Sequence, residues 1–364
     1  MARLGDYVKI RTGKLDANAS SENGEYPFFT CSVEPLKIDT YSYDCECVLV
    51  AGNGDLNVKY YNGKFDAYQR TYIIESNDKT ILSVPYLYCF LEKYVETLRK
   101  QSIGGVIKYI KLGNLTEAQI PLCNIDEQYK IVERINIVKT IISNRKQQLQ
   151  QLDELVKARF VEMFGDILSD NNLPLVQLKE LAYIGSSKRI YANEYVDSGV
   201  PFYRSKEIRE LGTGLKPSVE LFIKQERYDE IKEKYGVPKI GDILIAAIGA
   251  TIGYSWIVDT DKPFYYKDGN LIILSMKNNV NPIFLNHTIG ILIEDFKRKG
   301  VAGSAQLALT IEKLEKMMVV NPPIELQNKF ATFVEQVDKS KVAVQKALDE
   351  AQTLFDSLMQ EYFG

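Results

Sequence analysis

The chain has 364 residues, of which 45% are hydrophobic, and its formal net charge is −3 at pH 7. This length allows two domains with cores of their own, and the mild acidity argues against a simple nucleic-acid coat protein, whose affinity comes from many phosphate contacts. The five cysteines have no paired spacing, and neither a signal peptide nor a run of membrane-spanning length is visible. We therefore expect a soluble cytoplasmic protein with free thiols.

The first 122 residues have the pattern of short strands and turns followed by a helix. Tyr26–Phe29 and Cys47–Ala51 favour strands, and the pair Asn62-Gly63 predicts a β-hairpin turn. A helix should begin near Pro85, and a glycine-rich loop at Ile103–Ile110 should lead into a further strand.

A long helical stretch from Asp126 to Gly165 comes next, and the whole arrangement then repeats. A shift of 199 positions without a gap (103 to 302) lays residues 103–165 onto residues 302–364. Within the second module, Val200–Tyr203 corresponds to the first predicted strand, and a helix should begin near Pro282 as one does near Pro85. A repeat of this kind indicates two copies of one unit, a globular module followed by a long helix.

The long helices both carry hydrophobic residues at alternating four- and three-residue spacing, which is the pattern of a coiled-coil seam. Polar residues interrupt the two stripes at different levels: Arg145 and Arg159 correspond to Val344 and Leu358, while Lys341 corresponds to Ile142. This complementarity favours pairing of the two helices within one chain, as a rod of roughly 58 Å, although each helix could instead pack only on its own module. The predicted seam residues are Ile131, Ile135, Val138, Ile142, Leu149, Leu152, Val156, Val334, Val337, Val344, Leu348, Phe355 and Leu358.

Motifs for catalysis are weak throughout the chain. The single histidine, His287, lies in an apolar run and is better explained as a structural residue than as a metal ligand or a general base. The run Asn321-Pro322-Pro323 resembles the adenine-binding motif of DNA methyltransferases, but the next residue is Ile324 rather than an aromatic residue that could stack on a flipped base. We interpret the two prolines as marking the start of a helix. No Walker-type phosphate loop occurs, and we expect no metal site and no catalytic residue.

The order of these features resembles that of the DNA-specificity subunits of Type I restriction-modification systems. The residues that carry the resemblance are Gly241–Ile245 with Gly249, the glycine loop Ala302–Gln306, and Asn321–Gln327 at the start of the last helix. The first copy departs from the last of these motifs, since it has Ile125, an acidic residue and Gln128 but lacks the double proline. The resemblance covers the whole chain.

The resemblance implies an α+β fold with two similar target-recognition domains separated by two long helices, which form an intramolecular antiparallel coiled coil with a pseudo-two-fold internal repeat. The expected domains are 1–122 and 166–322, with helical regions at 123–165 and 323–364. The chain would read a bipartite double-stranded DNA target and act as a scaffold for two methyltransferase subunits and for restriction/translocase subunits. It would be non-catalytic, and S-adenosylmethionine, ATP and Mg would be bound by the partner subunits.

Residues for DNA contact are expected where cations and amides occur in loops beside aromatic residues, because cations bind phosphates and the side chains of Arg, Asn and Gln read base edges. The candidates are Lys14, Asn53, Asn57, Lys59, Lys64, Gln69, Arg70, Lys108, Lys111, Lys188, Arg189, Arg204, Lys206, Arg209, Lys267, Asn270, Lys297, Arg298, Lys299 and Gln306. Two other functions stay open at this point: a stand-alone adenine DNA methyltransferase, and a coiled-coil adaptor without DNA binding.

Overall fold

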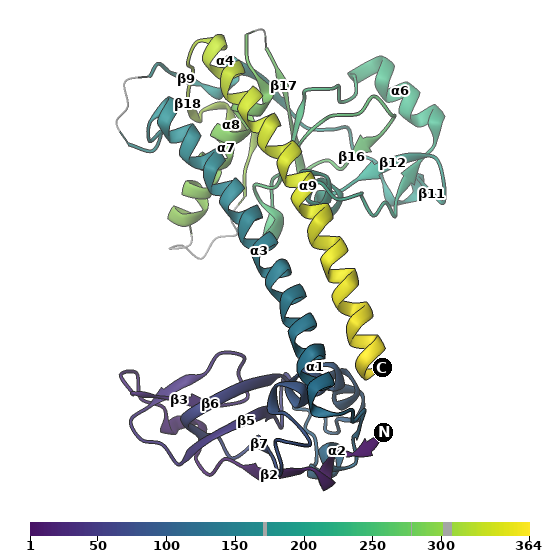
Figure 1. The fold of residues 1–364 in the computed structure, drawn as a ribbon. Helices are drawn as coiled ribbons and strands as arrows, with labels where there is room; N and C mark the ends of the chain where they lie inside the picture. The colour runs from purple at the N-terminus through teal and green to yellow at the C-terminus, as the bar shows by residue number, and fades with distance from the viewer. Residues whose placement is uncertain (170–172, 278, 301–307) are drawn as a thin grey trace. The chain divides into compact units, whose positions relative to one another are not determined.

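A computed structural model describes residues 1–169, 173–277, 279–300 and 308–364. The chain divides into two compact units (Figure 1): unit 1 contains residues 1–149 and 343–364, and unit 2 contains residues 150–342. Two long helices, α3 (Ile125–Phe164) and α9 (Ile324–Phe363), each contribute to both units.

Unit 1 is built on a six-stranded sheet with the order β2-β7-β5-β6-β3-β4. An isolated bridge between Leu15 and Tyr68 also connects the chain after β2 to the chain after β6. The prediction of a hairpin turn at Asn62-Gly63 is wrong. Both residues lie inside β6, opposite Glu46 and Cys45, because unbroken pairing with β5 overrides the local turn preference. The strands are β2 (Val8–Thr12), β3 (Tyr26–Phe29), β4 (Leu36–Ile38), β5 (Tyr43–Ala51), β6 (Val58–Ala67) and β7 (Thr71–Ser76).

Helix α1 (Val84–Gln101) packs on this sheet and begins as the sequence predicts, with Pro85 in its first turn and the side chain of Ser83 accepting a hydrogen bond from the backbone N–H of Tyr86 (3.4 Å). The buried core joins side chains of the sheet and of α1 to the start of α3 and to the end of α9. The shorter elements of the unit include α2 (Leu112–Thr116) and the paired strands β1 (Ala2–Arg3) and β8 (Gln119–Ile120). The strand expected after the glycine loop is not formed, since Tyr109 makes only isolated bridges, with Ile103 and with Asn53.

Unit 2 contains two four-stranded sheets, β10-β17-β14-β15 and β11-β13-β12-β16, and a two-stranded pair, β18-β9. The predicted strand at Val200–Tyr203 and the helix starting at Pro282 are both present, so the two modules share their order of anchor elements. The strands are β9 (Leu175–Gln177), β10 (Ala182–Gly185), β11 (Tyr195–Val196), β12 (Val200–Tyr203), β13 (Phe222–Ile223), β14 (Ile243–Ala246), β15 (Ser255–Ile257), β16 (Tyr265–Tyr266), β17 (Leu271–Met276) and β18 (Met318–Val320). The helices besides α3 and α9 are α4 (Leu178–Leu181), α5 (Ser205–Gly212), α6 (Gln225–Tyr235), α7 (Pro282–Gly300) and α8 (Ile311–Glu315).

The two long helices run antiparallel and pack against each other in both units (Figure 1). In unit 1, Val138 and Ile142 contact a cluster around Ala351, and in unit 2, Phe160 lies against Phe330, with ring centres 5.3 Å apart. Residue numbers rise along one helix as they fall along the other, which is the pattern of an antiparallel pair. Lys341, which interrupts the apolar stripe, forms an ion pair with Asp153 of the other helix (2.7 Å). The structure thus contains an intramolecular antiparallel coiled coil.

The thirteen predicted seam residues all lie at buried or partly buried positions. Eight are buried: Ile131, Ile135, Val138, Ile142, Val156, Val334, Val337 and Val344. The other five are partly buried: Leu149, Leu152, Leu348, Phe355 and Leu358.

A buried glutamine ties each long helix to the helix of its own module. In unit 1, the side-chain carbonyl of Gln128 accepts a hydrogen bond from the backbone N–H of Ser83 (2.9 Å), and its amide donates to the carbonyls of Ile81 (2.7 Å) and Cys123 (2.9 Å). In unit 2, Gln327 makes the same kind of contacts. Its carbonyl accepts from the backbone N–H of Asn281 (3.0 Å), and its amide donates to the carbonyl of Pro322 (2.8 Å). The Asn-Pro-Pro motif therefore forms part of the structure at the start of α9.

Three further features bear on the predictions from the sequence. The five cysteines are free thiols. His287 is packed edge-on against Phe330 (5.3 Å between ring centres), and burial lowers the pKa of its imidazole. Within the described ranges, no helix combines the length and the apolar character needed to cross a membrane.

Candidate nucleic-acid interface

In unit 1, backbone hydrogen bonds bring together loops that are far apart in the sequence. The loop after β2 is joined to the turn between β6 and β7 by bonds from Gly13 N to Thr71 O (3.1 Å) and from Gln69 N to Leu15 O (2.9 Å). That turn is joined to the loop after β5 by the bond from Gly52 N to Arg70 O (2.7 Å).

The glycine loop after α1 is connected to the same group. Gly54 N donates to Lys108 O (2.9 Å), and Ile110 N donates to Gly52 O (2.9 Å). Four loops therefore form one continuous surface, which we call the unit 1 loop surface: residues 13–16, 52–57, 68–70 and 103–111.

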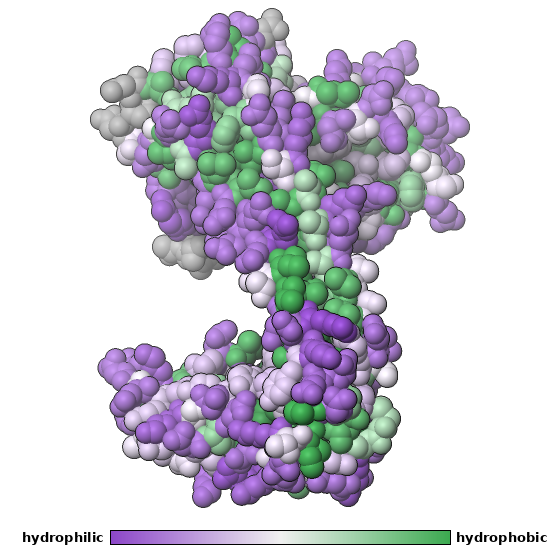
Figure 2. All heavy atoms as spheres, viewed as in Figure 1, coloured by the Kyte–Doolittle hydropathy of each residue, from purple (hydrophilic) through white to green (hydrophobic). Residues whose placement is uncertain are grey.

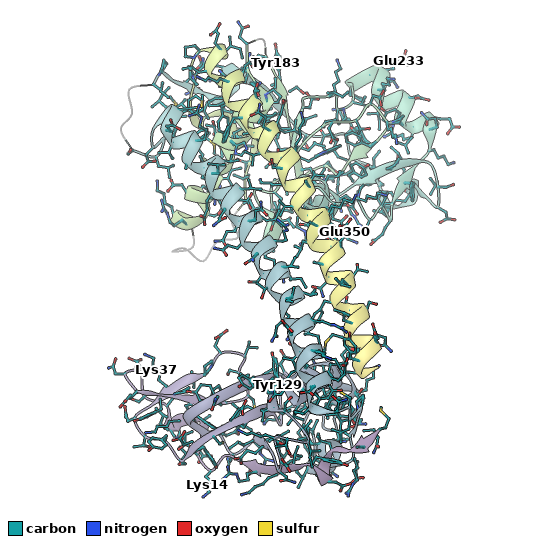
Figure 3. The ribbon with its side chains drawn as sticks, in the orientation of Figure 1. Lys14, Lys37, Tyr129, Tyr183, Glu233 and Glu350 are labelled. Carbon is teal, nitrogen blue, oxygen red and sulfur yellow. The ribbon has the colours of Figure 1, made fainter. Side chains whose placement is uncertain are left out.

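The unit 1 loop surface gathers most of the first module's candidates. Lys14, Arg70, Lys108 and Lys111 are exposed, and no ion pair is found for any of them among the described residues; Figure 3 labels Lys14, in the loop after β2. Gln69 also belongs to this surface, and its amide nitrogen donates to the carboxylate of Asp16 (2.7 Å). Unpaired cations beside amides suit phosphate binding with local base reading.

Asn57 belongs to this surface and Lys59 lies two residues beyond it, but their polar groups are already engaged. The amide of Asn57 donates to the carbonyls of Cys31 (2.8 Å) and Asp55 (2.9 Å), and its oxygen accepts a hydrogen bond from the ammonium of Lys59. Desolvation lowers the pKa of the Lys59 ammonium. Lys64 is not part of this network, because it lies on β6 opposite Asp44 with its ammonium 4.7 Å from the centre of the Tyr41 ring.

In unit 2, four candidates lie around the turn between β16 and β17. Lys188 is held at its backbone N–H by the hydroxyl of Tyr265 (2.7 Å), and the guanidinium of Arg189 pairs with Asp268 (2.8 Å). Lys267 and Asn270 belong to the turn itself. The N–H of Lys267 donates to Tyr203 O (2.9 Å), and the carbonyl of Asn270 accepts from Ala247 N (2.8 Å).

Arg204 and Lys206 are neutralised by two carboxylates. Glu207, which is fully buried, accepts hydrogen bonds from the backbone N–H (2.8 Å) and the guanidinium (2.9 Å) of Arg204. Glu220 accepts from Lys206 (2.7 Å) and Arg204 (2.9 Å), and these hydrogen bonds lower the pKa of Glu220 to about 2. Arg204 thus serves first to compensate a buried charge, whereas Arg209, further along α5, is exposed.

The basic run of Lys297, Arg298 and Lys299 occupies the last turn of α7, where positive charge is favoured by the helix dipole. Each of the three pairs with an acidic residue of the same helix, Lys297 with Glu294 and the other two with Asp295. Gln306 lies outside the described residues.

Several residues of these surfaces carry no signal in the sequence. Asp16, Glu207 and Glu220 form hydrogen bonds with candidate side chains. Their residue type and sequence positions do not indicate these contacts, which can be recognised only in the folded chain. Across the residues with described positions, no group of three or more His, Cys, Asp or Glu side chains could hold a metal ion.

Comparison with known proteins identifies the family. The Type I restriction modification DNA specificity domain matches residues 1–154 and 172–351. The type I restriction enzyme EcoDI specificity subunit of Escherichia coli is 37% identical over 154 residues, which are 42% of this chain and 34% of that protein, so this match spans about a third of the relative. The type I restriction enzyme MjaVIII specificity subunit of Methanocaldococcus jannaschii is 24% identical over 95% of this chain and 89% of its own length.

The fold is also known from a solved structure. The crystal structure of a Type I restriction-modification system S subunit from M. genitalium covers 100% of this chain and 95% of its own, with a TM-score of 0.65 at 17% identity. Specificity subunits are generally free of cofactors, and neither a stand-alone methyltransferase nor an adaptor without DNA binding is favoured. The chain belongs to the Type I restriction-modification DNA specificity family and is a non-catalytic DNA-recognition and scaffold subunit.

Proposed function

We propose that the chain reads a bipartite DNA target with one half-site per domain, residues 1–122 reading one and residues 166–322 the other. The observation that carries this proposal is the internal repeat: two modules with the same anchor elements, each followed by one helix of an antiparallel pair. An antiparallel pair of repeated units has approximate two-fold symmetry, as duplex DNA does, so each module can meet its half-site in an equivalent way. The seam residues hold the two helices together, and the helical regions 123–165 and 323–364 form the coiled coil.

Within unit 1, we assign DNA contact to the unit 1 loop surface. Its free cations, Lys14, Arg70, Lys108 and Lys111, would bind phosphates, while the amides of Asn53 and Gln69 have the donor and acceptor needed to read a base edge. Of the candidate cations of unit 2, Lys188, Lys267 and Arg209 form no ion pair among the described residues, although the ammonium of Lys188 lies 4.4 Å from the centre of the Tyr235 ring. These three would take the corresponding role there.

The partners are two methyltransferase subunits and, for cleavage, restriction/translocase subunits. Apolar side chains reach the surface of the long helices (Figure 2), and on α3 they line a groove of about 560 Å³ that includes Tyr129, Ile137 and Ile141. Exposed apolar side chains on a helix are typical of protein–protein contact. S-adenosylmethionine, ATP and Mg would be bound by these partners, and the complex would act in the cytoplasm.

The test is purification of the tagged chain from its native host, followed by native mass spectrometry of the complex. We expect two methyltransferase subunits per chain, and methylome sequencing of the same host should show a split adenine-methylated target. A complex with one methyltransferase per chain would contradict the two-fold scaffold, and a continuous target would contradict the assignment of one half-site to each domain.

A further inference from the structure

The glycine loop of unit 1 carries two adjacent apolar side chains that are largely exposed. Val106 is 104% exposed, the largest value among the exposed large hydrophobic residues described, and its neighbour Ile107 is 64% exposed. Scattered exposed hydrophobic residues are common on protein surfaces. These two differ because they are adjacent and stand at the tip of a loop.

The backbone of this loop is closely defined. Ile103 and Tyr109 close its base with two reciprocal hydrogen bonds, of 3.0 and 2.9 Å. Gly104 has a φ of +119°, and a Cβ atom there would lie 2.5 Å from the carbonyl oxygen of Ile107. The turn therefore requires glycine, and the loop that carries the tip has a defined backbone conformation.

The loop is fastened to the surface that we assign to DNA. Lys108, directly after the tip, accepts the hydrogen bond from Gly54 N, and Asn53 forms a bridge with Tyr109. The apolar tip thus stands next to an unpaired cation and to an amide. The same few residues combine groups for phosphate contact, for base reading and for apolar contact.

We propose that Val106 and Ile107 contact the C5-methyl group of a thymine in the major groove of the half-site read by unit 1, an inference that rests on the function proposed above. Their side chains have no hydrogen-bond donor or acceptor, so they can recognise only an apolar feature of a base pair. In the grooves of DNA the thymine methyl is that feature, and it lies in the major groove. Lys108 and Asn53 would fix the position of the tip on the duplex.

The experiment uses the full-length chain assembled with its methyltransferase subunits and a duplex that carries the target found by methylome sequencing. Each thymine of the target is replaced singly by deoxyuridine, which removes only the methyl group. For the wild-type complex we expect one replacement to weaken binding by roughly fivefold or more. The double variant Val106→Ser/Ile107→Ser should bind the thymine and deoxyuridine duplexes equally.

The matched control is Ile81→Ser, which changes another exposed apolar side chain of unit 1 (45% exposed) outside the loop and should keep the discrimination. The proposal is overturned if no thymine affects binding by the wild type, or if the double variant still discriminates. It is also overturned if the double variant loses its methyltransferase subunits while the DNA discrimination survives, since the tip would then contact protein. A wild-type complex that does not prefer its target to a shuffled duplex would refute the proposed function itself, whereas target preference without methyl discrimination refutes only this inference.

Discussion

Gln128 offers the sharpest test of how a recognition module is fixed to its long helix. Its side chain is fully buried and makes three hydrogen bonds, all with backbone atoms: one from the N–H of Ser83 and two to the carbonyls of Ile81 and Cys123. The substitution Gln128→Leu keeps a side chain of similar size but removes every one of these bonds.

The expected loss of stability follows from the groups that are left without partners. A buried backbone group that loses its hydrogen bond costs about 1–3 kcal/mol, and three such groups are affected here. Allowing for partial relaxation and for the better burial of leucine, we expect unit 1 to lose about 3–5 kcal/mol. With about 2–4 °C per kcal/mol for a domain of this size, its melting temperature should fall by roughly 6–20 °C.

The measurement is thermal unfolding of the full-length chain followed by near-UV circular dichroism. Gln150→Leu is the matched control, because Gln150 is an exposed residue of the same helix whose amide donates a hydrogen bond to Glu154 (3.1 Å). That variant should change stability by about 0.5 kcal/mol or less. If Gln128→Leu were no more destabilising than Gln150→Leu, the hydrogen bonds of Gln128 would not be what attaches the module to its long helix.

Four further predictions test other parts of the structure. Lys108→Ala should lower affinity for all duplexes alike and reduce the salt dependence of binding by about one phosphate contact, measured by fluorescence anisotropy at several salt concentrations; an effect on one sequence only would contradict a phosphate contact. Arg204→Ala should destabilise unit 2 by about 3–5 kcal/mol in denaturant unfolding, because the buried carboxylate of Glu207 loses its guanidinium, while Arg209→Ala should have little effect. Phe330→Ala should cost about 3–5 kcal/mol in the same assay, since it opens a cavity in a cluster of four buried or packed aromatic rings. Deleting one heptad from both α3 and α9 should alter or abolish the preferred spacer in the methylome, and an unchanged spacer would refute a measuring role for the helices.

The long helices and the anchor elements could be predicted from the sequence because their signals are local and periodic. The heptad spacing fixes which face of α3 and of α9 is buried, and the prolines at 85 and 282 mark where α1 and α7 begin. The Asn-Gly pair at 62–63 misled for the opposite reason: its turn preference is local, whereas β6 is held by pairing along its length with β5. Asn62 and Gly63 therefore adopt the strand conformation of the residues around them in β6.

The candidate interface was accessible to sequence reasoning only in part. Residue type indicated Lys14, Arg70 and Lys108, but nothing in the sequence showed that their loops are joined by backbone hydrogen bonds. Residue type was also insufficient to separate free cations from those already paired, because the carboxylates of Glu207 and Glu220 that bind Arg204 are recognisable only in the fold. Which bases are read depends on these local arrangements of side chains, and residue composition does not determine them.

The two buried glutamines suggest how one scaffold can carry modules with unrelated recognition loops. Gln128 and Gln327 each bond to two equivalent backbone groups: an N–H at the residue before α1 or α7, and a carbonyl two residues before α3 or α9. A backbone group is present whatever side chain the position carries, so the fastening needs only that the chain follow the same path at the junction. The loops of the unit 1 loop surface, to which we assign DNA contact, are under no such requirement, because they are held by bonds among themselves. Substitutions in those loops can therefore change which DNA is bound at little cost to the attachment of the module, provided that glycine is kept where the backbone demands it, as at Gly104.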